Sequence, residues 1–170
     1  IIRSSTLSED SSFESNAGKY LSILNVEDHD LADSIDKVYS SYDSNLAEDE
    51  VIVQSIVSDV IFSGVAFTHD PKSKSPYTVI NWSEGSDTSY VTSGKGGRTW
   101  VQVSNATNTP KLLKPIIELI RELNIIFNFR PLDIEFALSN NQGEKTLWVL
   151  QVRPLIVDPS ESESKLIKNL

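Results

Sequence analysis

Four polar residues near the end of the chain lie at alternate positions in otherwise apolar runs. Asp133 and Glu135 interrupt one run, and Gln151 and Arg153 interrupt a later one. Because side chains alternate between the two faces of a strand, each pair shares one face. A hairpin centred on Gly143 would place Asp133 opposite Arg153. The same register places Glu135 opposite Gln151, so the spacing predicts a compact group of two acids, one amide and one cation.

The chemistry suited to this group is metal binding. Two carboxylates about 4 Å apart repel by roughly 4 kcal/mol at an effective dielectric of about 20, and one Arg offsets only part of that. Oxygen ligands from Glu135 and Gln151 suit Mg²⁺, which usually takes one or two protein oxygens and completes its shell with water and phosphate. The alternative is a solvated hairpin face with one exposed ion pair worth about 0–1 kcal/mol. Spacing alone favours that alternative.

The opening segment could approach a phosphate. Arg3 follows a short apolar run and offers forked donors, while Gly18 lies in a polar stretch where the missing Cβ allows a close approach. Taken alone, these residues fit a surface role for Arg3 and turn chemistry for Gly18 better.

Two helices are predicted from the hydrophobic pattern. Apolar residues recur at helical spacing between residues 31 and 42, in a helix that begins near Asp28 or Asp30. A second helical stripe covers residues 112–123, with Thr109 as its N-cap.

Strands must position the polar group, and the alternation predicts which residues support it. Trp148, Leu150 and Val152 are expected on the core side, and Ala137 is expected opposite Val149. Strands are predicted at residues 1–2, 51–57, 64–68, 77–82, 100–103, 133–138 and 146–153, with residues 139–145 as a hairpin turn. Strands and helices together predict an α+β or α/β layered domain with a mostly antiparallel sheet.

Composition limits the classes of function. The chain has 170 residues, with 15 Lys and Arg against 24 Asp and Glu, a formal charge of −9, and no Cys or Met. An acidic surface repels phosphate backbones, so we expect no nucleic-acid partner. No apolar run approaches the roughly 20 residues of a membrane span, so we expect no membrane partner. The absence of cysteine fits a reducing compartment, and a cytoplasmic location is expected.

Five motifs occur in a fixed order along the chain: RSST…ED…AGKY…LNV at 3–26, VIVQ…V at 51–57, SGVAFTHDP at 63–71, DIEF at 133–136 and LQVRP at 150–154. In type and order they resemble the N-terminal nucleotide-binding domain of the phosphoenolpyruvate synthase and pyruvate phosphate dikinase family. Five ordered motifs are far more specific than any one of them. The resemblance implies an ATP-grasp-like α+β fold with a mostly antiparallel sheet and packed helices.

The resemblance also implies an activity. Domains of this family bind Mg-ATP between two lobes and phosphorylate a histidine carried by a separate swivelling domain. By carry-over of the motifs, Arg3 would contact the phosphates and Gly18 would line the phosphate loop. Ser22 would lie nearby, and Gln54 would lie by the adenine.

The hairpin residues receive roles from the same carry-over. Glu135 and Gln151 would bind ATP through Mg²⁺. Arg153 would neutralise the charge of the transferred phosphoryl group, and Asp133 would support the metal or orient Arg153. These roles agree with the chemistry expected from spacing, because phosphoryl transfer asks the protein mainly for positioning and charge stabilisation.

The domain organisation implied is a partial ATP-grasp domain over residues 1–157, followed by a polar tail or linker over residues 158–170. The chain resembles the later part of that domain. The implied partners are therefore ATP, an upstream ATP-grasp lobe and the phosphohistidine domain of a parent protein. The expected protein is an ATP-dependent phosphotransferase that is inactive as this piece alone.

The alternative is a diverged, non-catalytic nucleotide-binding or structural module of a larger protein. Loop residues that depart from the family pattern, such as Ser11-Ser12 and the stretch at 83–86, favour it. The polar group on the hairpin favours the enzyme.

Overall fold

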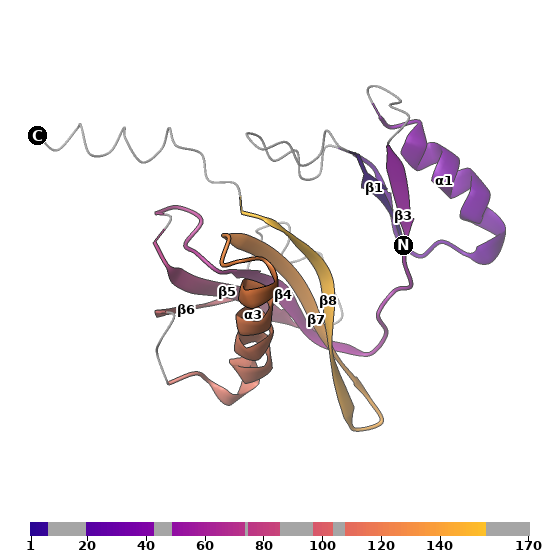
Figure 1. The fold of residues 1–170 in the computed structure, drawn as a ribbon. Helices are drawn as coiled ribbons and strands as arrows, with labels where there is room; N and C mark the ends of the chain where they lie inside the picture. The colour runs from indigo at the N-terminus through magenta and orange to yellow at the C-terminus, as the bar shows by residue number, and fades with distance from the viewer. Residues whose placement is uncertain (7–19, 43–48, 74, 86–96, 104–107, 156–170) are drawn as a thin grey trace, which may run out of the picture. The chain divides into compact units, whose positions relative to one another are not determined.

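The computed structural model describes residues 1–6, 20–42, 49–73, 75–85, 97–103 and 108–155 (Figure 1). Within them the chain divides into two units, residues 1–56 and residues 57–170, and each unit has its own sheet. Gly18 and the predicted tail at 158–170 lie outside the described residues.

The first unit is a small sheet beside a helix. Its antiparallel strands have the order β2-β1-β3. Ile2, Tyr20, Val38 and Tyr42 form the buried cluster of the unit. The predicted helix is confirmed, whereas the strand predicted at 51–57 ends early, at Val53. The elements are β1 (Ile2–Ser5), β2 (Ser22–Ile23), the 3₁₀ turn η1 (Asp28–Asp30), α1 (Leu31–Tyr39) and β3 (Glu50–Val53).

The second unit contains a five-stranded antiparallel sheet of order β6-β5-β4-β7-β8. Every strand predicted here exists and is longer than predicted. In β5, β6, β7 and β8 the extra length arises mainly because pairing with neighbours carries the backbone through polar residues that the apolar pattern excludes. The strands are β4 (Val60–Phe67), β5 (Tyr77–Glu84), β6 (Arg98–Val103), β7 (Leu132–Asn141) and β8 (Glu144–Pro154).

One glycine explains why the prediction began β4 too late. Ser63 and Gly64 suggested a break, but both lie inside β4. A Cβ on Gly64 would lie 2.1 Å from the Asn81 carbonyl oxygen and 3.0 Å from the Phe136 ring. Gly64 therefore allows the backbone of β5 and the Phe136 side chain to pack closely on β4.

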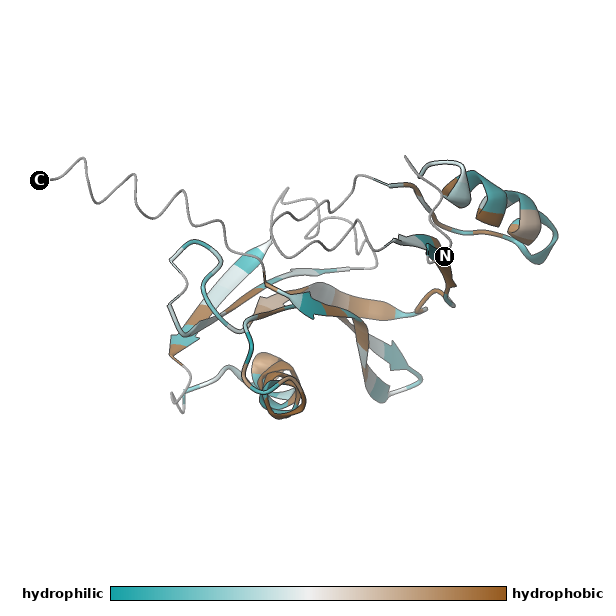
Figure 2. Ribbon diagram, turned by 45° about the horizontal axis from the view of Figure 1, so that its top comes forward, coloured by the Kyte–Doolittle hydropathy of each residue, from teal (hydrophilic) through white to brown (hydrophobic). Residues whose placement is uncertain are grey.

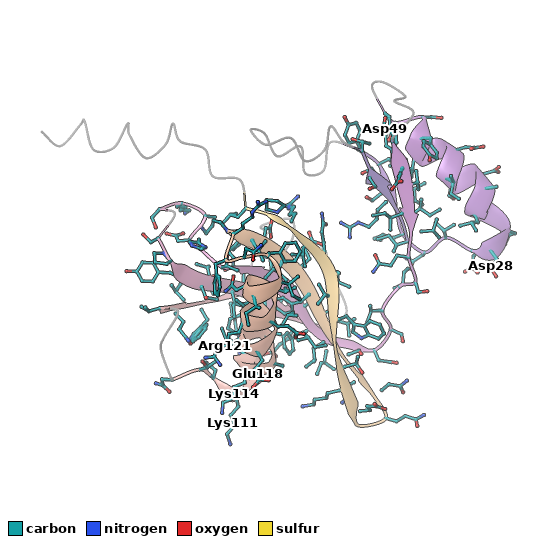
Figure 3. The ribbon with its side chains drawn as sticks, viewed as in Figure 1. Asp28, Asp49, Lys111, Lys114, Glu118 and Arg121 are labelled. Atoms are coloured by element: carbon teal, nitrogen blue, oxygen red, sulfur yellow. The ribbon has the colours of Figure 1, made fainter. Side chains whose placement is uncertain are left out.

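A single long helix covers one face of this sheet. The 3₁₀ turn η2 (Lys111–Leu113) leads into α3 (Lys114–Ile126), and Figure 2 shows α3 on one side of the strands. The outer surface of η2 and α3 carries exposed charges from Lys111, Lys114, Glu118 and Arg121 (Figure 3). The shared core contains Phe62, Ala66, Ile80, Trp82, Leu113, Ile116, Ile117, Ile120, Leu123, Leu132, Ile134, Phe136 and Leu138.

The start of this helix differs from the prediction. Thr109 does not cap it, because its hydroxyl instead donates to the Gln102 side-chain oxygen at 2.8 Å. Pro115 lies in the first turn of α3, where a missing N–H costs little.

Helices packed with antiparallel sheets make this an α+β protein, as predicted. None of the helices in the described part of the chain is long and apolar enough to span a membrane.

Candidate functional site

The predicted polar group lies on the face of the large sheet that points away from α3. Ile134 and Phe136 of β7 belong to the core beneath α3, so the alternate residues Asp133 and Glu135 point to the opposite face. We call this opposite face the site face. Its residues are Asp133, Glu135, Ala137 and Ser139 of β7, Arg153, Gln151, Trp148 and Thr146 of β8, and Phe67, Val65 and Ser63 of β4.

The cross-strand pairing of the polar group is the predicted one. Asp133 pairs with Arg153, and Glu135 pairs with Gln151. On the other side of β7, the neighbours in β4 are Phe67 and Val65, both apolar. The four polar side chains therefore form one group that is bounded on the β4 side by apolar residues.

A strong ion pair anchors one end of the group. The Nε and Nη2 groups of Arg153 both donate to Oδ2 of Asp133, at 2.9 and 2.7 Å. Both side chains are largely buried, with 21% and 11% of their surfaces exposed. The alternative of a solvated face with an exposed ion pair, which spacing alone favoured, is therefore wrong. A pair in this setting holds the guanidinium in one orientation, because two donors meet one oxygen.

The other carboxylate oxygen of Asp133 does not take part in this ion pair. Oδ1 is buried, and no hydrogen-bond donor reaches it within the described residues. A buried oxygen without a donor is costly, so it would gain from a cation or a donor brought by a ligand.

The donor set fits Mg²⁺. Two carboxylates and one guanidinium leave the group with a formal charge of −1, and Glu135 faces the amide of Gln151. All the available ligand atoms are oxygens, which Mg²⁺ prefers. No set of three or more His, Cys, Asp or Glu side chains in the described ranges could hold a metal alone. Mg²⁺ does not need such a set, because it keeps waters and binds substrate phosphates.

Beyond this group, the hairpin departs from the predicted register. Gln142 and Gly143 form a two-residue turn with φ of 51° and 94°, so the turn centre lies between them. A β-bulge at Leu150 then adds one residue to β8, because Glu135 pairs with Gln151 while Phe136 pairs with Val149. The displaced turn centre and the extra residue in β8 offset each other, so Asp133 and Glu135 keep their predicted partners.

The bulge corrects two predictions about the supporting residues. Ala137 pairs with Trp148 rather than with Val149. Trp148 was predicted on the core side, and that is wrong, because the extra residue turns its side chain onto the site face. The sequence carried no signal for this, since both Trp148 and Leu150 are apolar.

In the first unit, two of the predicted residues meet. Arg3 pairs with Ser22 across β1 and β2, and with Ile52 across β1 and β3. Gln54 lies just after β3, where its backbone N–H donates to the Ile1 carbonyl at 2.9 Å. Gln54 therefore lies at the end of this sheet, two residues beyond Ile52.

The comparison with protein families gives one match. The family model of the pyruvate phosphate dikinase AMP/ATP-binding domain matches residues 1–108 of the 170. The match includes Arg3, Gly18, Ser22 and Gln54, and it ends before β7 and β8. No curated protein sequence matches the chain.

Proposed function

Because the chain belongs to the family of pyruvate phosphate dikinase AMP/ATP-binding domains, we propose that it binds Mg-ATP for the phosphorylation of a histidine on a separate domain. The family is the ATP/AMP-binding part of dikinase-type enzymes. The observation that carries the finer proposal is the pairing of Glu135 with Gln151 beside the buried Asp133–Arg153 ion pair.

Glu135 and Gln151 are proposed to hold the metal. Bound Mg²⁺ would neutralise phosphate charge and orient the phosphoryl group. Glu135 supplies the negative charge that attracts the cation, and Gln151 supplies a neutral oxygen directly across the strand pair. Buried Oδ1 of Asp133 adds a further acceptor at the same end of the face.

Arg153 is proposed to bind the transferred phosphoryl group. A guanidinium offers forked donors that match phosphate oxygens, and its worth depends on being in place before the reaction. Asp133 supplies that placement through the two hydrogen bonds to Oδ2. Asp133 is therefore a positioning residue in this proposal.

The first unit is proposed to supply further nucleotide contacts. Arg3 and Ser22 are cross-strand neighbours, and together they offer a cation and a hydroxyl to phosphate oxygens. Gly18 would let backbone approach the phosphates, and Gln54 would lie by the adenine, as the resemblance implies.

Calorimetry with Mg-ATP tests the proposal. We expect weak binding that requires Mg²⁺, and we expect Glu135→Ala to weaken it by about one to two decades, the usual worth of a charge-assisted contact. Glu118→Ala is the matched control, because Glu118 is an exposed acid on α3, which packs against the other face of the sheet (Figure 3).

The possible outcomes separate the two candidate functions. Tight binding without metal, or binding unchanged by Glu135→Ala, would place the site elsewhere. No binding at all would favour the structural form of the non-catalytic module. We expect no phosphoryl transfer by this chain alone, since the acceptor histidine is proposed to lie on another domain.

A further inference from the structure

The β-bulge in β8 has a consequence for the site face. Without the extra residue at Leu150, strand alternation would put Trp148 on the face beneath α3. With it, Trp148 lies on the same face as Glu135 and Gln151. Bulges beside functional sites commonly re-aim a side chain in this way.

Trp148 is held in place and yet accessible. Its indole Nε1 donates to the Ser139 hydroxyl at 2.9 Å, which restricts rotation of the ring. Its cross-strand partner, Ala137, is fully buried, whereas Trp148 keeps 44% of its surface exposed. A large aromatic side chain placed opposite so small a neighbour stands above the sheet surface.

The residues of the site face follow a chemical order along β7 and β8. Of the three pairs that include Trp148, Gln151 and Arg153, the pair of Ala137 with Trp148 lies nearest the hairpin turn. Two positions further along β7 comes the pair of Glu135 with Gln151, and two positions beyond it lies the ion pair of Asp133 with Arg153. Ala137 lies four positions after Asp133 in β7, which is about 13 Å at the usual rise of a strand. The face thus passes from an aromatic side chain, through the proposed metal ligands, to the proposed phosphate contact.

We propose that Trp148 is a stacking platform for the base of the nucleotide. This inference rests on the proposed function, since it takes Glu135 and Gln151 as the metal site and Arg153 as the contact of the terminal phosphoryl group. With the phosphates at that end, the base of an extended nucleotide lies toward Trp148. Stacking on an aromatic ring is available to every base, so the platform would hold the base without selecting it by hydrogen bonds.

The test compares ligands with and without a base. Calorimetry measures Mg-ATP and Mg-tripolyphosphate on wild type, Trp148→Phe and Trp148→Leu. Both variants lose the hydrogen bond to Ser139, so their difference isolates the aromatic ring. Trp148→Leu should bind Mg-ATP roughly fivefold or more weakly than Trp148→Phe, the lower end of what stacking contributes.

Tripolyphosphate serves as the folding control. Its affinity should be equal for the two variants, because it carries no base. Phe129→Leu is the matched control for an exposed aromatic outside the sheet, and it should leave both ligands unaffected.

The failures are distinguishable. If Trp148→Phe and Trp148→Leu bind Mg-ATP equally while Glu135→Ala loses both ligands, the platform is wrong and the metal site stands. An equal loss of both ligands in Trp148→Leu would assign Trp148 to the structure of the hairpin and overturn the platform. If wild type binds neither ligand, the proposed function and this inference fall together.

Discussion

Asp133 uses its two carboxylate oxygens for different tasks. Oδ2 accepts both hydrogen bonds from Arg153, and buried Oδ1 accepts none from the described residues. The first oxygen fixes a guanidinium, and the second would suit a cation or a donor that arrives with a ligand. A single residue thus links the stability of the hairpin to the proposed chemistry.

Asp133→Asn should destabilise the protein. The substitution keeps the shape of the side chain but removes the charge that both Arg153 hydrogen bonds depend on, and it leaves Arg153 largely buried. We expect a loss of about 1.5–3 kcal/mol in the free energy of unfolding, measured in urea. Glu84→Gln breaks the exposed pair with Arg98 and should change stability by less than about 0.5 kcal/mol. Equal effects of the two substitutions would contradict the assigned role of the buried pair.

A turn beyond the end of β4 offers a pH-dependent prediction. The Ser73 hydroxyl and, next, the Lys72 backbone N–H donate to the Asp70 carboxylate, and they lower its pKa below the ordinary value. Because the pKa is depressed in the folded state, the stabilisation is present above the ordinary pKa of Asp and is lost as the pH falls through the folded value.

Ser73→Ala should therefore raise the pKa of Asp70 toward its ordinary value. The substitution removes the hydrogen bond that contributes most to the shift. Titration of the Asp70 carboxyl carbon by NMR measures it, and Ser75→Ala is a control from the same turn that does not donate to the carboxylate. An unchanged titration midpoint would assign the shift to another group.

At the scale of elements, the β7–β8 hairpin sets the geometry of the site. Its turn places Gln142 and Gly143 at positive φ, which matches the twist of a tight hairpin. The bulge at Leu150 then restores the pairing of Glu135 with Gln151. The site therefore depends on a turn and a bulge acting together.

Gly64→Ala should disrupt the sheet far more than Gly143→Ala. The first substitution forces a Cβ to within 2.1 Å of the Asn81 carbonyl oxygen, so backbone must move. A Cβ added at Gly143 would meet no atom within 4 Å beyond the adjacent residues, and only the φ of 94° makes the change unfavourable. We expect about 1 kcal/mol of destabilisation at Gly143 and several times that, or loss of folding, at Gly64, by thermal and urea unfolding. Similar costs at both positions would show that β5 can move away from β4.

At the scale of the whole molecule, charge limits the partners. The chain has a formal charge of −9, which repels the polyanion that the site is proposed to bind. The Mg²⁺ proposed to be held by Glu135 would offset this repulsion locally, whereas a nucleic acid would meet the repulsion along its whole backbone.

The chain should not bind duplex DNA, even at low salt. In a gel-shift titration at about 50 mM salt, we expect no complex up to about 10⁻⁴ M protein, the weak end of ordinary non-specific affinity. Mg-ATP binding measured in the same buffer is the positive control. A DNA complex that weakens steeply as salt is added would indicate a cationic surface that the composition does not suggest.

The sequence alone determined which polar residues share a face. Strand alternation has a period of two, so Asp133 and Glu135 had to share one side of β7, and hydrophobic neighbours had to fill the other. Both helices followed from periodicity in the same way, while the pattern of strands and helices left α+β and α/β both open. These properties are local, which is why the sequence contained them.

Tertiary structure decided the register of the hairpin and the face on which Trp148 lies. A bulge inserts one residue without changing composition, so apolar Trp148 and Leu150 could not be assigned to faces from their types. The continuity of β4 through Gly64 was hidden for a related reason, since only the approach of Asn81 and Phe136 shows why a glycine lies within a strand. The bulge in β8 and the continuity of β4 both depend on contacts between strands, and such contacts produce no periodic pattern in the sequence.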